Sequence, residues 1–240
     1  MRYRWLVVTA TLVAALAALL FAIAGPGVRL GLWTFGTGFG LIRWAAYAGG
    51  AAVPLSLLAL GLARPRAQVA AVLVLVLVAS AAMLWLPWRW MQQARRLPPI
   101  HDVTTDTADP PVFVAVLPLR AGARNSAEYG GDSIAALQQR GYPDIRPLRL
   151  DVLPDSAFSR AEDAARAMGW EIVAADAAAR RIEATATTRW FGFKDDVVVR
   201  VRPDGDTGSR VDVRSVSRVG RSDVGANAAR IRAYLARLST

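Results

Sequence analysis

The N-terminal part of the chain contains three long runs of residues without a charged side chain. They cover residues 5–24, 44–63 and 69–88, and each run is twenty residues long. An α-helix rises about 1.5 Å per residue, so about twenty residues cross a bilayer core of about 30 Å. Because backbone groups in lipid must bond to one another, such runs become helices. We therefore predict a membrane region, residues 1–92, with three transmembrane helices.

The ends of these runs are rich in tryptophan, whose amphipathic ring favours the depth of the membrane–water interface. The tryptophans found there are Trp5, Trp33, Trp44, Trp85, Trp88 and Trp90. Gly49 and Gly50 are expected to let a neighbouring helix approach closely. Ion- and proton-conducting paths usually carry charge inside the membrane, and these runs carry none. We interpret the helices as an anchor or scaffold in the lipid bilayer.

Arginines beside the helices bear on their orientation. Four of them favour a cytoplasmic N-terminus: Arg2, Arg4, Arg64 and Arg66. Five would then lie on the opposite side: Arg29, Arg43, Arg89, Arg95 and Arg96. The count does not decide, so we follow the first helix, which usually dominates, and expect the C-terminal domain outside the cytoplasm. Residues 22–24 resemble a signal-peptidase site, and cleavage there would leave the domain on the same side.

Residues 93–111 are predicted to be an extended linker, because they contain two proline pairs separated by polar residues. Asp102, Asp106 and Asp109 lie near His101 in this stretch. Their spacing does not match a calcium-binding loop, so a solvated loop is favoured over a metal site.

Residues 112–240 are predicted to form a soluble α+β domain. The pattern indicates a helix within residues 125–140, a strand at 148–152, a helix from Asp155 or Ser156 to about Met168, and strands at 170–175, 181–188, 196–202 and 210–219. Ser222 and Asp223 are then expected to cap a final helix that runs to about Leu238. Alternating strands with short connections favour an antiparallel sheet with one solvated face. The order strand, helix, four strands, helix resembles that of TATA-binding-protein-like folds in topology alone, which implies no DNA binding.

The net charge of +10 raises the question of nucleic-acid binding. The arginines are spread along the chain instead of forming a basic run, and no zinc spacing accompanies them. We therefore expect no nucleic-acid partner, although anionic lipid head groups would attract this charge. The chain has no cysteine, which excludes thiolate catalysis and iron–sulfur clusters.

Residues 188–196 are the first segment with candidate chemistry, because aromatic residues there surround a glycine and precede three charged residues. Trp190 and Phe193 could form an aromatic lip for a ligand, with Lys194 attracting an anion. Alternatively, the two aromatic side chains close the end of the core at a strand connection.

Arginines on the last two predicted strands are the second candidate. Arg214 and Arg218 share one strand face by their even spacing, and Arg200 and Arg202 face the same way if the strands are in register. Guanidinium groups beside the helix that starts at Ser222 could bind a carboxylate or phosphate. Alternatively, Glu183 and Asp212 pair with the arginines in a salt-bridge lattice of little net stability.

Asp196 and Asn227 complete the candidate ligand-binding residues. Asp196 follows Asp195 in a strand, so the two carboxylates face opposite ways and cannot act on one substrate. Asn227 lies near Arg230 in the final helix and is expected to bond locally. His101 is the only histidine, and no Ser/His/Asp set can be assembled in the domain, so we assign no catalytic residue, cofactor or metal.

Three segments resemble domain-of-unknown-function family 1499: residues 100–106, residues 189–198, and residues 212–223 together with Asn227. The resemblance covers residues 98–238 and leaves the membrane helices outside. It implies a bacterial envelope or organellar domain with no established activity, and it supplies no catalytic residues.

We therefore expect a multi-pass protein of the bacterial inner membrane with an extracytoplasmic binding module. The module would bind an anionic small molecule, a lipid head group or an envelope component. The alternative is a scaffold that binds an envelope protein through the polar sheet face, and an enzyme is less favoured.

Overall fold

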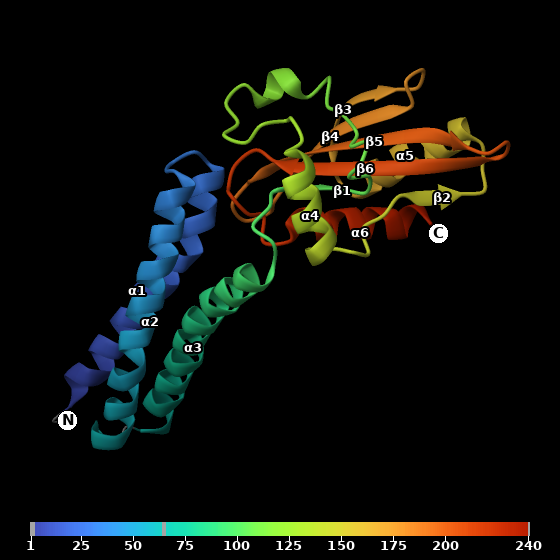
Figure 1. Ribbon diagram of the computed structural model, residues 1–240. Helices are drawn as coiled ribbons and strands as arrows, with labels where there is room; N and C mark the ends of the chain where they lie inside the picture. The colour runs from blue at the N-terminus through green and yellow to red at the C-terminus, as the bar shows by residue number, and fades with distance from the viewer. Residues whose placement is uncertain (1–2, 64–65, 240) are drawn as a thin grey trace. The chain divides into compact units, whose positions relative to one another are not determined.

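The computed structural model describes residues 3–63 and 66–239 (Figure 1). Two compact units are present. One ends at Gln93 and also includes Arg189–Gly192, and the other comprises Ala94–Thr188 and the chain from Phe193 onward. Arg2 and Arg64, which entered the orientation argument, lie outside the described residues.

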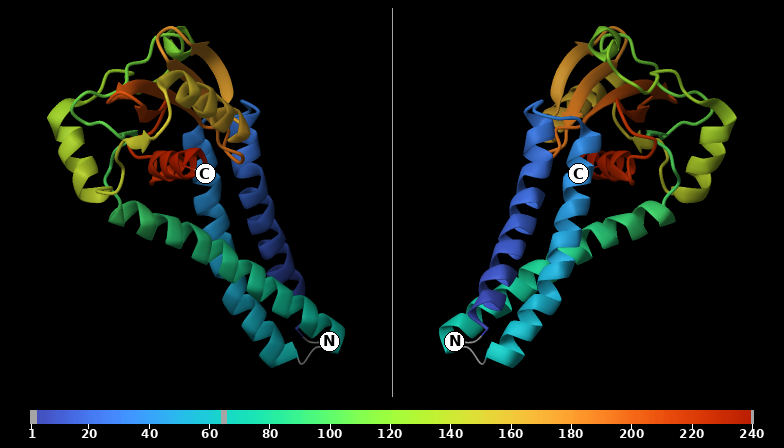
Figure 2. Two further views of the ribbon diagram at one scale, coloured as in Figure 1. Left: turned by 90° about the vertical axis from the view of Figure 1, so that its right-hand side faces the viewer. Right: turned by 90° about the vertical axis from the view of Figure 1, so that its left-hand side faces the viewer.

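The first unit is built from the helices α1 (Arg4–Arg29), α2 (Phe35–Ala63) and α3 (Ala67–Arg96). All three are long and apolar enough to cross a membrane, which confirms the predicted transmembrane helices. They extend beyond the uncharged runs because an arginine near a helix end can extend its charged head toward water. Figure 2 shows α1 and α2 side by side, with α3 crossing them at an angle.

Small residues bring the helices together. Ala10 of α1 and Ala59 of α2 are fully buried in one cluster with Leu73 of α3. A Cβ on Gly49 would lie 3.1 Å from the side chain of Met83, so α2 and α3 approach closely there, as expected. Larger apolar side chains such as Leu12 remain exposed, as lipid-facing residues would be.

The second unit contains one antiparallel sheet in the order β1-β6-β5-β4-β3, with β2 also paired to β6. The strands are β1 (Asp102–Thr104), β2 (Leu148–Leu150), β3 (Glu171–Asp176), β4 (Arg181–Thr187), β5 (Lys194–Asp204) and β6 (Gly208–Ser217). The helical elements are η1 (Leu117–Arg120), α4 (Gly131–Gly141), α5 (Pro154–Ala167) and α6 (Ala226–Leu238). The α+β class and the order strand, helix, four strands, helix are confirmed by β2, α5, β3 to β6 and α6.

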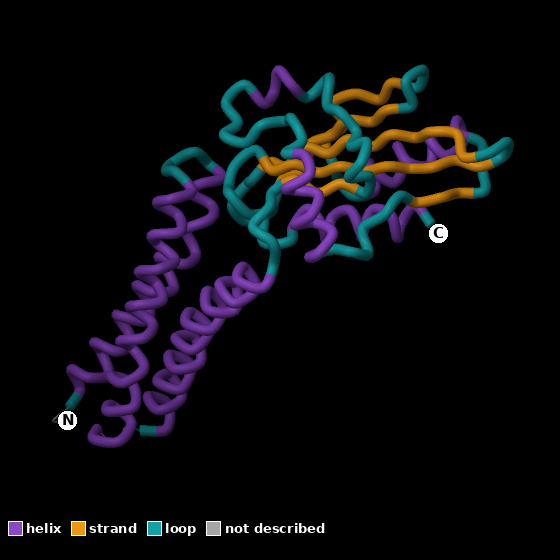
Figure 3. The backbone as a smooth tube through the Cα atoms, in the orientation of Figure 1, coloured by secondary structure: helices purple, strands orange, loops and turns teal. Residues whose placement is uncertain are grey.

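One face of the sheet carries the apolar core. Val199 of β5, Val213 of β6 and Ile182 of β4 are buried beneath α5 and α6 (Figures 1 and 3). From α6, Ile231 and Tyr234 point into this core, with Tyr234 donating a hydrogen bond to the carbonyl oxygen of Ala161 at 2.8 Å. The predicted amphipathic helices therefore supply the apolar cover of this face.

The final helix begins at Ala226, slightly later than a cap at Ser222 and Asp223 implies. The backbone N–H groups of Gly225 and Asn227 donate to the two carboxylate oxygens of Asp223 at 2.9 and 2.6 Å. Asp223 thus satisfies free N–H groups at the start of the helix from a position outside it, which confirms the predicted cap at this residue.

The stretch in which we predicted a solvated linker contributes β1 to the sheet. Asp102 and Thr104 are buried there, and β1 pairs with β6 at residues 214–216. The amide side chain of Gln138 on α4 accepts from the N–H of Thr104 at 2.9 Å and donates to its carbonyl at 2.6 Å. Because Gln138 occupies these backbone groups, it blocks further pairing at this sheet edge.

The expectation of a solvated second face was wrong. Glu183, Asp196, Asp212 and Arg214 on that face are all buried. The covering layer is the long loop of residues 105–130 that contains η1 (Figure 3). Alternation in the strands gave the correct partition of side chains between faces, but it contained no information about this distant cover.

Candidate binding site on the polar face of the sheet

Asp212 is the centre of an ion-pair lattice at one end of the polar face. Its carboxylate accepts from Arg200 at 3.0 Å, Arg202 at 2.9 Å and Arg210 at 2.8 Å. Asp106 of the covering loop accepts from Arg210 at 2.6 Å and from Arg202 at 3.2 Å. The arginines therefore join the sheet to the loop, and the predicted salt-bridge lattice between Asp212 and these arginines is present.

The pKa of Asp106 reflects this setting. Burial raises the pKa, but hydrogen bonds from the backbone N–H groups of Asp109 and Ala108 and the charges of Arg210 and Arg200 outweigh burial. The net result is a pKa below the usual value for aspartate.

A second ion cluster surrounds Asp196 at the other end of the face. Its carboxylate accepts from Arg218 at 2.8 and 2.9 Å, from Arg120 of η1 at 2.5 Å, and from the Thr185 hydroxyl at 2.8 Å. Burial raises the pKa of Asp196, but the hydrogen bonds from Arg218, Thr185 and Arg120 lower it by more than burial raises it. The pKa of Asp196 therefore lies below its usual value. One carboxylate is thus shared by two guanidinium groups.

Arg214 lies between the two clusters and is itself 1% exposed. It binds Asp102 through two hydrogen bonds, at 2.9 and 2.7 Å, and donates to the carbonyls of Pro111 and Ala127 at 3.2 and 2.8 Å. Two parallel N–H···O bonds are the strong geometry for a guanidinium and a carboxylate. Its charge is therefore neutralised inside the protein.

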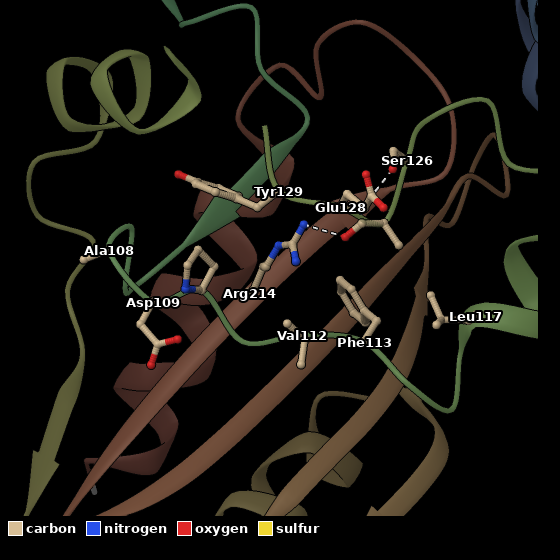
Figure 4. Close-up of a pocket in the computed structure, with 11 residues that line it drawn as sticks. Ala108, Asp109, Val112, Phe113, Leu117, Ser126, Glu128, Tyr129 and Arg214 are labelled. Atoms are coloured by element: carbon tan, nitrogen blue, oxygen red, sulfur yellow. Dashed lines mark hydrogen bonds between the residues drawn. The ribbon is translucent and has the colours of Figure 1, made fainter. Parts of the chain in front are cut away.

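Aromatic rings from the covering loop pack on this guanidinium. The Arg214 carbon Cζ lies 5.2 Å from the ring centre of Phe113 and 5.4 Å from that of Tyr129 (Figure 4). The Cζ of Arg120 lies 6.0 Å from the centre of the Phe113 ring. Such cation–π contacts are worth about 0.5–2 kcal/mol each. We call these four residues the arginine–aromatic stack.

Glu183 fixes the loop at a third point. Its carboxylate accepts from the backbone N–H groups of Val114 and Val116 at 3.0 Å and from Arg181 at 3.0 Å. A buried carboxylate that holds main-chain N–H groups dictates the local path of the chain. Phe113 and Val116 are buried as a result, whereas Val112 and Val114 project outward.

A pocket of about 670 Å³ opens beside the arginine–aromatic stack (Figure 4). This volume falls in the range typical of ligand pockets. Its lining residues include Val112, Phe113, Leu117, Glu128, Tyr129 and Arg214. Val112 and Leu117 are 64% and 46% exposed, so the pocket has an apolar rim above a floor that contains buried Arg214.

The strand register confirms that Arg200, Arg202 and Arg214 share one face of the sheet. Arg218 reaches the same face, where it pairs with Asp196. Lys194 lies at the end of this face, where its carbonyl accepts from the backbone N–H of Arg218 at 3.0 Å. The guanidinium groups of Arg200, Arg214 and Arg218 are bound to carboxylates and do not form an open anion site.

The predicted aromatic lip is divided between the two units. Trp190 belongs to the first unit, where its ring centre lies 5.0 Å from that of Phe21. Phe193 belongs to the second unit, where its backbone exchanges hydrogen bonds with Thr188 at the turn between β4 and β5.

Asn227 lies on the opposite side of the sheet. It donates to the carbonyl of His101 at 2.9 Å and to the Ser217 hydroxyl at 3.1 Å, and it accepts from the Ser215 hydroxyl at 2.8 Å. Ser222 accepts from the backbone N–H of Val224 at 3.2 Å. These two residues hold the chain that leads into α6, and the sheet separates Asn227 from the arginines of the polar face. Asn227 also accepts from Arg230 of its own helix, so the expected local bond is present.

Sequence reasoning missed Phe113, Arg120 and Tyr129 of the covering loop, and it assigned Asp102 of β1 to a solvated loop. Alternation of apolar residues across 112–116 and the row of aspartates before it were the available signals. Among residues 3–63 and 66–239, no three His, Asp or Glu side chains are grouped to hold a metal ion.

Comparison with known families gives one match. The family model described as protein of unknown function (DUF1499) matches residues 102–238, which contain every residue of the polar-face clusters. A search of curated proteins gave no significant match.

Proposed function

The chain belongs to the DUF1499 family of proteins of unknown function, and we propose that it is a membrane-anchored binding module of the bacterial envelope. Its binding surface would be the pocket beside the arginine–aromatic stack. The observation that carries the proposal is a pocket whose walls belong to a loop that side-chain contacts fix to the sheet. Arg214, Asp106 and Glu183 hold the covering loop in place, so that little order has to be gained on binding.

Photo-crosslinking tests this surface. A benzophenone amino acid replaces Leu117 in the full chain, and the same residue replaces Leu153 as a control, because Leu153 is 58% exposed and lies outside the pocket lining. We expect a discrete adduct in native membranes from position 117 alone. Equal labelling at both positions, or none at position 117, would contradict the proposal.

We further propose that the second unit lies outside the cytoplasm of a bacterial inner membrane. Arg4 is the first residue of α1, and the three helices that could span a membrane give an odd number of crossings among the described residues. An alkaline phosphatase fused after Thr240 should be active, because that enzyme needs an oxidising compartment. An inactive fusion, with a fluorescent protein active at the same site, would reverse the orientation.

A second candidate function, binding of an anionic group, is favoured by one observation. Lys194 has no ion-pair partner among the described residues, and it neighbours Arg218, whose carboxylate partner Asp196 is shared with Arg120. Inorganic phosphate would then raise the melting temperature of the full chain, and Lys194→Gln would remove the effect. An unchanged melting temperature at millimolar phosphate would count against it.

A further inference from the structure

The apolar rim of the pocket continues as an exposed strip along the covering loop. Val112 and Leu117 line the pocket, and Val114 and Leu119 beside them are 50% and 53% exposed. The strip is fixed because the alternate residue Phe113 is buried in the arginine–aromatic stack. A rigid apolar surface of this kind on a water-soluble domain is typical of an interaction site.

Two carboxylates at or near the pocket have no ion-pair partner among the described residues, although the chain as a whole carries +10. Glu128 lines the pocket, is exposed, and has no ion-pair partner among residues 66–239. Asp132, in the first turn of α4, is also exposed and without an ion pair among those residues. Arg214 does not offset them, because Asp102 already neutralises it.

We infer that the pocket and strip bind a segment of a partner protein that carries apolar side chains beside a lysine or arginine. This inference rests on the proposed function and adds the chemistry of the partner. An apolar side chain of the segment packs against Val112, Phe113 and Leu117, and its cation lies beside Glu128. Charge complementarity of this kind selects among partners that the apolar contacts alone would accept.

Two labelled peptides test the inference on the full chain in phosphatidylcholine nanodiscs. One alternates leucine with arginine and the other alternates leucine with glutamate, so that their apolar content is matched. Fluorescence anisotropy should show that the arginine peptide binds about tenfold more tightly than the glutamate peptide. A difference of about 1.4 kcal/mol in charge interaction accounts for a tenfold difference in affinity. Glu128→Gln should remove most of this preference, and Leu117→Asp should abolish binding. Leu153→Asp, at an exposed leucine outside the pocket lining, should change neither the affinity for the arginine peptide nor the preference for it.

Several outcomes would overturn the inference. They are equal affinity for the two peptides, tighter binding of the glutamate peptide, and a preference that survives in Glu128→Gln. Self-association of the full chain that Leu117→Asp abolishes would assign the surface to a second copy and would also overturn it. If neither peptide binds while the adduct from position 117 persists, the inference fails and the proposed function stands. If the adduct is also missing, both fail.

Discussion

The two faces of the sheet are covered in different ways. On one face, α5 and α6 lie on valine, isoleucine and alanine side chains, whereas on the other a loop is held by carboxylates and guanidinium groups. Apolar contact is non-directional, so many helices of suitable pattern would cover the first face. Ion pairs with hydrogen bonds fix both position and direction. We therefore interpret the charged face as the part that specifies where residues 105–130 lie.

Removing Asp212 should have the largest effect. Asp212→Ala would leave Arg200, Arg202 and Arg210 around a buried site without their central carboxylate, and we expect a loss of about 3–5 kcal/mol in the free energy of unfolding of the second unit. Pulse proteolysis of the full chain in urea measures it. Asp155→Ala breaks an exposed pair with Arg180 and should cost less than about 1 kcal/mol. Similar losses in both variants would remove the distinction between buried and surface pairs.

Truncation of the helical cover should cost somewhat less. Ile231 is fully buried in α6, and Ile231→Ala should lower the free energy of unfolding by about 2–4 kcal/mol through lost apolar burial and a cavity. Unlike the Asp212 variant, this one should leave proteolysis at residues 105–130 under native conditions unchanged. Cleavage of the loop in Ile231→Ala would show that the two covers are not independent.

Acid should weaken the charged face through Asp196. The folded pKa of Asp196 is below its usual value of 3.8, so the unfolded state binds more protons on acidification. The stability that this carboxylate contributes is therefore complete above the unfolded pKa and is lost as the pH falls through the folded pKa. Asp196→Asn should cost about 1.5–3 kcal/mol at pH 7, as expected for hydrogen bonds to a charged group. Its difference from the wild type should shrink below about pH 4. A difference that is constant from pH 7 to pH 3 would exclude an ionised Asp196 as the source.

The smallest effect is expected in the arginine–aromatic stack. Phe113→Leu keeps an apolar side chain but removes the ring that Arg214 and Arg120 contact, and we expect a loss of about 1 kcal/mol. Urea denaturation of the full chain measures the change. An unchanged stability would mean that the ring contributes by burial alone.

The sequence predicted the helices and the sheet because both depend on regular spacing. The uncharged runs gave three membrane helices, and period-two alternation placed Arg214 and Arg218 on one face. Regular spacing did not predict that residues 105–130 cover that face. The contacts of Asp102 with Arg214 and of Arg120 with Asp196 join residues that are 112 and 76 positions apart in the chain. Local composition made the stretch around Asp102 look like a linker, since prolines and aspartates are common in solvated loops.

The central claim is that charged groups hold residues 105–130 as a fixed layer on the sheet. Hydrogen exchange of the full chain in nanodiscs tests this claim most directly. The amide protons of Val114 and Val116 donate to Glu183, so we predict that they exchange as slowly as those of β5, and that Asp212→Ala accelerates exchange across the whole layer. Exchange of residues 112–117 in the wild type as fast as that of the exposed turn at residues 205–207 would contradict the account.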